Sequence, residues 1–209
     1  MDVRDLLDNP GTAAYSRIKY LQRFGSQEEV AQFLSGLFRA AVEARYTGEW
    51  RELESFLHRW EDVAIDYQFR SMKFPEEGPT PWSRLNKPLS EATVALVTTG
   101  GLYLEGGEPF QERGDPTYRV IPRNAPRDSL RIWHPGYDHG PALQDVNCIF
   151  PIDRFEELEA EGVIGSLAGN NYSFMGLIPD PTELMERTAP ELARRLKDEG
   201  VDAVFLAST

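Results

Sequence analysis

A proline-rich segment divides this chain into two parts of different character. Residues 74–88 contain four prolines and a glycine, namely Pro75, Pro79, Pro81, Pro88 and Gly78. Proline lacks a backbone N–H and fixes its own backbone angle, so this composition resists both a helix and a central strand. We therefore predict a helical extension over residues 1–73, a linker over residues 74–90 and a separately folded domain over residues 91–209.

The N-terminal extension is predicted to contain a helical hairpin. Ser26 is followed three residues later by Glu29, which is the spacing of a capping box at the start of a helix. Apolar residues then recur at helical spacing over residues 30–42 and again over residues 53–67, with Thr47 and Gly48 between the two runs. Two amphipathic helices joined by a tight turn pack against each other as a hairpin.

Beyond the proline-rich segment, short hydrophobic runs alternate with helical or glycine- and proline-rich stretches. The runs cover residues 92–98, 130–133, 147–151 and 203–207. Helices between them are predicted to start at Asp153 and at Asp180, and to stop at Gly162 and Gly200. This alternation predicts an α/β fold with a parallel, Rossmann-like sheet in a three-layer arrangement, preceded by the helical hairpin.

The charge of the chain restricts its partners. The 209 residues include 34 acidic and 22 basic side chains, a net charge of −12, which repels nucleic-acid phosphates and anionic lipid surfaces. The longest uncharged hydrophobic stretch, residues 92–104, is shorter than the roughly 20 residues of a membrane-spanning helix, and the first residues open no signal peptide. We expect a cytoplasmic protein that binds neither nucleic acid nor membrane. The single cysteine, Cys148, excludes an internal disulfide framework.

The turn after the first predicted strand is a candidate binding site. It contains Thr99, Gly100 and Gly101. Glycines allow backbone N–H groups to approach a carboxylate or phosphate closely, but a plain tight turn has the same composition. The three-glycine pattern of dinucleotide-binding proteins is missing, so NAD is not indicated.

A second candidate loop follows the run at residues 130–133. It carries His134, Tyr137 and Asp138, and Asp145 and Asn147 come shortly after. These side chains could position a substrate, donate a proton, hold a divalent metal or simply brace the loop. His134 and His139 are five residues apart in a proline- and glycine-rich loop, which matches no usual zinc pattern, so we assign no metal site.

Two further features remain open. Cys148 lies in an apolar run, where cysteine usually behaves as a small buried hydrophobic residue, and a catalytic role is the less favoured alternative. Residues 170–175 offer amide and hydroxyl groups, including Ser173, that either line the same cleft or close a turn.

Several sequence blocks, in order along the chain, resemble the selenoprotein B family of the glycine, sarcosine, betaine and D-proline reductases. They are TVALVTTGG at residues 93–101, GDPTYRVIP at 114–122, Tyr137-Asp138, DVNCIFPIDR at 145–154, EGVIGSL at 161–167, YSFMG at 172–176 and GVDAVFL at 200–206. The resemblance covers about residues 81–209. The N-terminal hairpin has no evident counterpart in these reductases.

The resemblance implies that a nucleophile follows the last strand. In the family, a strand ending in a Leu-Thr-Ser-Thr-like sequence is followed directly by selenocysteine or cysteine, which opens a cysteine-rich redox loop. Here the corresponding residues are Leu206, Ala207, Ser208 and Thr209, with alanine in place of the usual threonine. We therefore expect a longer selenoprotein whose selenocysteine comes directly after Thr209, with Ser208 and Thr209 in the site. No catalytic residue is expected within residues 1–209.

The resemblance also implies a function. It predicts a reductase subunit that cleaves a carbon–nitrogen or related bond in a small amine or amino-acid-like substrate. Selenocysteine would be part of the full-length protein, a partner subunit could carry a pyruvoyl group, a thiol would donate electrons, and the complex would be oligomeric. Two alternatives stay open. One is a complete, non-catalytic assembly subunit that docks through the hairpin near Tyr46 or Trp50, and the other is a metal-dependent hydrolase using His134, Asp138 and His139.

Overall fold

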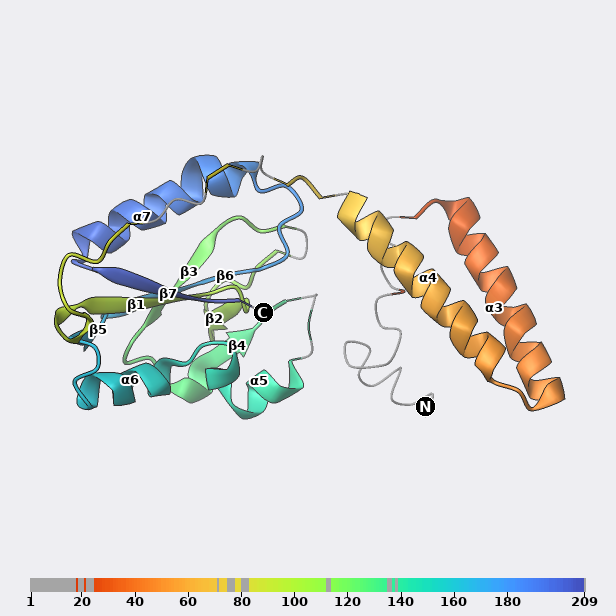
Figure 1. Ribbon diagram of the computed structural model, residues 1–209, viewed down its shortest axis with the longest axis horizontal. Helices are drawn as coiled ribbons and strands as arrows, with labels where there is room; N and C mark the ends of the chain where they lie inside the picture. Colours follow the sequence, from red (N-terminus) through yellow and green to blue (C-terminus); the bar gives the residue numbers. More distant parts are fainter. Residues whose placement is uncertain are drawn as a thin grey trace. The chain divides into compact units, whose positions relative to one another are not determined.

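A computed structural model describes residues 18, 21, 25–70, 72–74, 78, 79, 83–111, 114–134, 137 and 139–208 (Figure 1). The chain divides into two compact units, Met1–Lys73 and Phe74–Thr209, which are treated separately below. Two of the predicted site residues, Asp138 and Thr209, lie outside the described residues.

The first unit contains the predicted hairpin, formed by helices α3 (Gln27–Thr47) and α4 (Arg51–Arg70). The capping box is present: the Ser26 hydroxyl accepts a bond from the Glu29 N–H at 3.2 Å, and the Glu29 carboxylate accepts one from the Ser26 N–H at 2.8 Å. Gly48 ends α3 in the left-handed conformation, with φ 78°, and its N–H donates to the Ala44 carbonyl. Between the helices, the Phe33 ring packs 5.5 Å from that of Trp60.

The second unit is built on a mostly parallel sheet with strand β1 (Thr93–Thr98) at its centre. β1 pairs in parallel with β5 (Ser166–Leu167), β6 (Asn170–Phe174) and β7 (Ala203–Ala207). Strand β3 (Tyr118–Pro122) pairs with β6 in the antiparallel sense. Because β7 follows one edge of β1 from Val94 to Thr98, β5 and β6 share the other edge.

A bulge separates β5 from β6 along that shared edge. Val94 pairs with Leu167 and Val97 with Tyr172. The β5–β6 segment therefore advances by five residues where β1 advances by three. The buried Asn171 side chain fills the interruption, since its Oδ1 accepts the Leu96 N–H at 2.8 Å. The amide thus completes a backbone ladder that would otherwise leave a buried donor without an acceptor.

Helices cover both faces of this sheet (Figure 1). On one face, helix α7 (Ala189–Asp198) packs Leu192 and Leu196 against Val97 and Tyr172. On the other lie α5 (Gly140–Gln144), α6 (Ile152–Ala160) and a small antiparallel sheet of β2 (Leu102–Leu104) and β4 (Leu130–Ile132). A π-helical turn, Leu184–Thr188, leads into α7. The predicted α/β class, with its mostly parallel sheet between helices, is confirmed, although the Rossmann-like detail is only partly matched.

Three local predictions are wrong. Residues 147–151 do not form a strand, because the Asp145 side chain caps a 3-10 helix, Val146–Cys148, at that place. The run at residues 130–133 does give a strand, β4, but it pairs with β2 outside the parallel sheet. Helix α6 begins one residue before Asp153, with Pro151 at the N-cap position, so Asp153 lies in the first turn and does not cap the helix.

Other local predictions hold. Gly162 and Gly200 have positive φ angles of 72° and 74°, as expected where helices end. Asp180 accepts a bond from the Thr182 N–H at 3.1 Å at the start of the helical segment that continues into α7. Within the described part of the chain, no helix is both long and apolar enough to cross a membrane.

Candidate functional site

The carboxyl ends of β1 and β7 lie side by side. Thr98 pairs with Ala207, and the next N–H along, that of Thr99, donates to the Ala207 carbonyl at 2.9 Å. Ser208 directly follows Ala207, so the structure brings the ends of the two segments that carry Thr99 and Ser208 to one edge of the sheet. In open α/β sheets, this edge is where ligands usually bind.

The turn after β1 uses its backbone N–H groups internally. The Gly100 N–H donates to the Thr98 hydroxyl at 3.0 Å, and the Gly101 N–H donates to the Phe174 carbonyl at 2.9 Å. The turn is therefore a structural one, and these N–H groups do not form the anion cradle that the glycines suggested. Gly101 is required for its shape, because φ is 70° and a Cβ atom would lie 2.1 Å from the Trp133 carbonyl oxygen.

The second candidate loop packs onto this turn. The Tyr137 hydroxyl donates to the Gly100 carbonyl at 2.8 Å, and the ring of buried His134 lies 4.9 Å from that of Tyr137. His139 completes the cluster, with its ring 4.8 Å from Tyr137 and its Nε2 2.6 Å from the His134 carbonyl oxygen. The structure thus unites two loops that are more than thirty residues apart in the sequence.

The environment of Tyr137 favours its neutral form. Burial raises the pKa of the phenol, and the neighbouring Cys148 adds to the rise. Tyr137 therefore acts as a hydrogen-bond donor throughout the physiological pH range. Cys148 itself is exposed, which corrects the expectation of a buried side chain. The cause is the 3-10 helix, Val146–Cys148, which replaces the predicted strand.

Gly176 is a member of this cluster that the sequence analysis did not assign to the site. A Cβ atom there would lie 3.1 Å from the Thr99 Cβ and 3.2 Å from the His134 Nε2. Only the position of Gly176 at the end of the YSFMG block hints at this contact in the sequence. Ser173 has a different role, because its buried hydroxyl accepts the Leu102 N–H at 2.7 Å and holds the chain at the start of β2.

Asp145 and Asn147 form a second group. The Asp145 carboxylate accepts bonds from the Asn147 N–H at 3.0 Å and its side-chain amide at 2.8 Å. The Asn147 amide also donates to Asp153 at 2.8 Å, and its oxygen accepts the Asp153 N–H at 3.1 Å. Bonds from Asn147 lower the pKa of both carboxyl groups, and Arg127 lowers that of Asp153 further. These contacts brace the loop.

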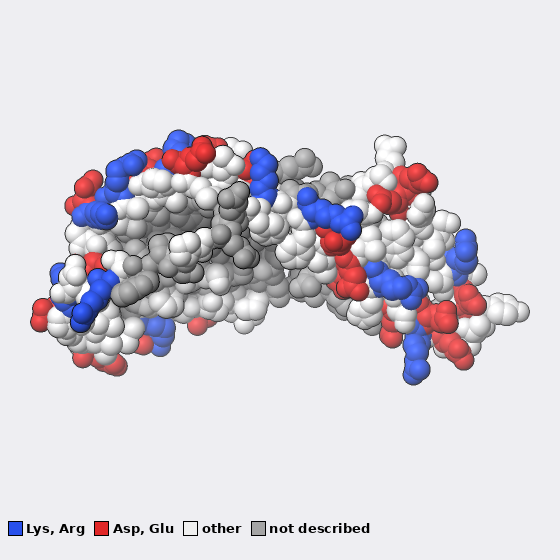
Figure 2. Space-filling view, turned by 45° about the horizontal axis from the view of Figure 1, so that its top comes forward, with Lys and Arg blue, Asp and Glu red and all other residues white. Residues whose placement is uncertain are grey.

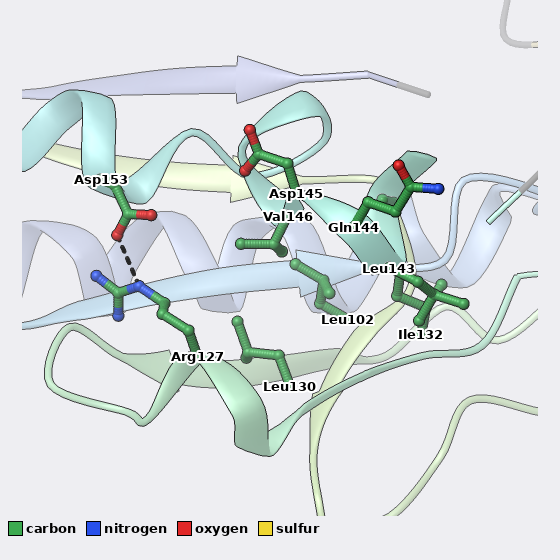
Figure 3. Close-up of a pocket in the computed structure, with 10 residues that line it drawn as sticks. Leu102, Arg127, Leu130, Ile132, Leu143, Gln144, Asp145, Val146 and Asp153 are labelled. Atoms are coloured by element: carbon green, nitrogen blue, oxygen red, sulfur yellow. Dashed lines mark hydrogen bonds and ion pairs between the residues drawn. The ribbon is translucent and has the colours of Figure 1, made fainter. Parts of the chain in front are cut away.

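A cavity of about 250 Å³ lies beside this group (Figure 3). Its walls are polar and apolar in about equal measure, with Leu102, Leu130, Ile132 and Val146 among the apolar residues. At one end Arg127 and Asp153 form an ion pair at 2.8 Å, while Asp145 lies on another wall. Its dimensions suit a molecule of amino-acid size.

The described residues contain no group of three His, Cys, Asp or Glu side chains placed to hold a metal ion. Asp138 lies outside the described residues, so this result tests only His134 and His139 of the three residues in the hydrolase alternative.

Comparison with known proteins identifies the family. Residues 16–209 match the family model described as glycine/sarcosine/betaine reductase selenoprotein B. The chain belongs to this selenoprotein B family. The match includes both helices of the hairpin, which corrects the expectation that the resemblance begins near residue 81.

Relatives of this selenoprotein B family chain are named as reductase subunits. It is 43% identical over 134 residues to the D-proline reductase subunit gamma of Acetoanaerobium sticklandii, covering 64% of this chain and 55% of that protein. It is 28% identical over 230 residues to the glycine reductase complex component B subunit gamma of Symbiobacterium thermophilum, covering 97% of this chain and 53% of that protein. It is 32% identical over 128 residues to the betaine reductase complex component B subunit beta of Peptoclostridium acidaminophilum, covering 59% of this chain and 29% of that protein. The chain thus spans about half the length of the D-proline reductase and Symbiobacterium thermophilum subunits, and less than a third of the betaine reductase subunit. No solved structure matches it.

Proposed function

We propose that this chain forms part of a subunit of a reductase complex of the glycine, sarcosine, betaine or D-proline type. The reaction is the reductive cleavage of a carbon–nitrogen or related bond in a small amine or amino-acid-like substrate. The observation that carries the proposal is the meeting of the β1 and β7 ends, where the Thr99 N–H bonds to the Ala207 carbonyl beside the Tyr137 and His134 loop.

In this proposal, a selenocysteine or cysteine directly after Thr209 supplies the nucleophile, and a selenol there would be ionised at neutral pH because its pKa lies well below the ~8.5 of a thiol. The hydrogen bond between Thr99 and Ala207 directs the end of β7 towards the cluster. Tyr137 holds the Gly100 turn through its hydrogen bond, and Gly176 leaves room for Thr99 and the His134 ring.

The proposed binding residues comprise two groups with different roles. Around the sheet edge they are Thr99, Gly100, Gly101, His134, Tyr137, Asp138, Ser173, Ser208 and Thr209, of which Gly100, Gly101 and Ser173 shape the site through the internal bonds described above. Beside the cavity they are Asp145 and Asn147. The acidic Asp145 suits a substrate ammonium group, since Asn147 and the lowered pKa keep its carboxylate ionised and oriented. The names of relatives as subunits or complex components favour a partner subunit, which could carry a pyruvoyl group, together with a thiol electron donor.

The first test is genetic. The nucleotide sequence downstream of the codon for Thr209 should contain an in-frame UGA or cysteine codon followed by a cysteine-rich continuation. A gene with only untranslated sequence at that place would overturn the enzyme proposal and leave the non-catalytic assembly subunit as the better alternative.

The second test is biochemical and uses the full-length, selenium-containing protein with its co-encoded subunits and a dithiol. One of glycine, sarcosine, betaine and D-proline should be consumed. Asp145→Asn should raise KM about tenfold or more, because the charge-assisted bond to the substrate ammonium group is lost. The matched control is Asp128→Asn, at an exposed position in the 3-10 helix Arg127–Ser129. An unchanged KM in Asp145→Asn would remove this residue from the site.

A further inference from the structure

Strand β7 forms one edge of the sheet, and its outer backbone groups can pair with another strand. Within the described residues, β1 is the only strand that pairs with β7. The Ala207 carbonyl accepts the Thr99 N–H on the β1 side. Because backbone groups alternate between the two sides of a strand, the N–H and C=O of Leu206 point to the outer edge. An edge of this kind is a template for a further strand.

The side chains of β7 are apolar and exposed on both faces of the sheet. Val204, Phe205 and Leu206 are 39%, 43% and 74% exposed. Leu206 is the partner of Val97, which belongs to the core under α7. Phe205 is the partner of Leu96, which belongs to the core on the opposite face. Both hydrophobic cores therefore extend onto β7, where the described residues leave them exposed.

The opposite edge of the same sheet shows what a protected edge strand looks like. That edge is β3, whose residues include Arg119 and Pro122, and both residue types discourage further pairing. Residues 203–207 of β7 read AVFLA and contain neither a charge nor a proline. An uninterrupted apolar run is typical of a parallel strand that is buried on both faces. The composition of β7 is therefore that of an inner strand.

The segment that follows Thr209 in the full-length protein is the best-placed occupant of this edge, because it is tethered to β7 itself. This step rests on the continuation in the proposed function. Helices α3 and α4 cannot supply the strand, since their backbone groups bond within each helix. A parallel neighbour needs a crossover of a dozen or more residues. The 134 matched residues make up only 55% of the D-proline reductase subunit gamma, so a protein of that length has room for one.

The handedness of the existing crossovers indicates where the connection runs. The chain passes from β6 to β7, across β1, through α7 on one face of the sheet. It passes from β1 to β5, in the opposite direction, through α6 on the other face (Figure 1). Crossovers between parallel strands are almost always right-handed, so reversing the direction changes the face. A step outward from β7 continues the direction from β6 to β7 and places its helix on the face of α7.

We propose that the segment after Thr209 in the full-length protein adds a parallel strand to the outer edge of β7. The connecting helix packs beside α7 and covers Val204 and Leu206, which lie on that face. The sheet then has β7 in its interior. A nucleophile directly after Thr209 would therefore stand between two strand ends and not at the margin of the sheet.

Amide hydrogen exchange in the purified full-length, selenium-containing protein tests the added strand. The outward-pointing N–H of Leu206 should exchange about 100-fold or more slowly than an unprotected amide, because a neighbouring strand would accept its hydrogen bond. An unprotected rate at Leu206, with the amides of β1 still protected, would overturn the proposal.

Replacement of Leu206 by lysine tests the covering helix. In the full-length protein, Leu206→Lys should lower the thermal midpoint by about 5 °C or more, because it places a charge in a buried apolar contact. The matched control is Val163→Lys, at a 44% exposed position after α6, which should lower the midpoint less. An uncovered β7 would give no larger loss for Leu206→Lys, since Leu206 is the more exposed of the two, and that result would overturn the proposal.

The remaining outcomes separate this inference from the proposed function. A purified protein whose mass ends at Thr209 would overturn both. A full-length protein that is active but has an unprotected Leu206 amide would overturn this inference alone. Protection that appears only with the co-encoded subunits, or only at high protein concentration, would assign the edge to another protein or to a second copy, and would also overturn it.

Discussion

At the scale of single residues, a comparison of Gly101 with Gly106 distinguishes the cost of backbone strain from the cost of a steric clash when a glycine is replaced. Both have φ near 70°, but a Cβ atom at Gly101 would meet the Trp133 carbonyl oxygen, while Gly106 has nothing within 4 Å. Gly106→Ala should lower the free energy of unfolding by about 1 kcal/mol through backbone strain alone. Gly101→Ala should lower it by roughly 2–4 kcal/mol, because a turn must also move. Urea denaturation measures both values, and equal losses would contradict this account.

The buried Thr98 hydroxyl links the end of β1 to the turn that follows it and to the segment at Ile149. It donates to the Ile149 carbonyl at 2.7 Å and accepts the Gly100 N–H at 3.0 Å. Thr98→Val keeps the shape of the side chain but leaves both backbone groups without this partner, so the free energy of unfolding should fall by about 1–3 kcal/mol.

The matched control for Thr98→Val is Thr93→Val, at the other end of β1. The Thr93 hydroxyl is only partly buried and contacts the Ser166 hydroxyl. This control should cost less than the Thr98 change. A larger loss at Thr93 would mean that the buried hydroxyl is not the important group, and urea denaturation again provides the comparison.

At the scale of elements, Glu199 fastens the end of α7 to β6. Its carboxylate accepts bonds from the Tyr172 hydroxyl at 2.7 Å, the Arg195 Nε at 3.0 Å and the Asn170 amide at 3.2 Å. Burial acts to raise the pKa of Glu199, but these donors outweigh it and lower the pKa. Glu199→Gln should therefore reduce the free energy of unfolding by about 1–2 kcal/mol.

Glu161→Gln is the control for the Glu199 change. Glu161 is exposed and occupies the equivalent position after α6, so its replacement should alter the free energy of unfolding by less than about 0.5 kcal/mol. Similar losses in the two variants, measured by chemical denaturation, would show that the contacts of Glu199 contribute little.

The sequence predicted those elements whose signals are local. Helices α3 and α4 follow from their apolar periodicity, the capping box and Gly48. The 3-10 helix Val146–Cys148 was mistaken for a strand because its apolar neighbours resemble one, and the deciding Asp145 cap acts through a side chain. The pairing of β4 with β2 depends on contacts between distant segments, which periodicity cannot reveal.

The same distinction applies to the candidate site. A parallel sheet places the turn after its first strand and the end of its last strand at the carboxyl edge, and the structure has Thr99 and the end of β7 there. The direction of each side chain could not be predicted, and Ser173 therefore turned out to be an internal hydrogen-bond acceptor. Gly176 was missed because its contact with His134 requires the folded loop, and a glycine carries no chemical signal.

At the scale of the whole molecule, ion pairs between basic and acidic groups should govern the response to acid. On the face shown in Figure 2, basic and acidic side chains are interspersed over both units. Bonds from the Asn147 side chain and Arg127 lower the pKa of Asp153, and the Arg123 side chain lowers that of Glu159. A lowered folded-state pKa means that ionisation favours the folded state. This stabilisation is fully present above the unfolded pKa values of about 4 and is lost as the pH falls through the folded values.

Asp153→Asn tests this prediction. The variant should be less stable than the wild type at pH 7, and the difference should shrink towards pH 3, where the wild-type carboxyl group is protonated as well. Denaturant titrations at several pH values measure the difference. A gap of constant size from pH 7 to pH 3 would show that the charge of Asp153 does not contribute.

The exposed Cys148 gives the molecule a built-in attachment point for a spectroscopic reporter. It is the single cysteine of the 209 residues, and it lies close enough to Tyr137 to influence its titration. In the 209-residue chain, a maleimide dye would therefore label one defined position next to the loop that packs on the Gly100 turn. Its emission would register small molecules arriving at that edge of the sheet, so candidate compounds could be screened by fluorescence before any turnover assay exists.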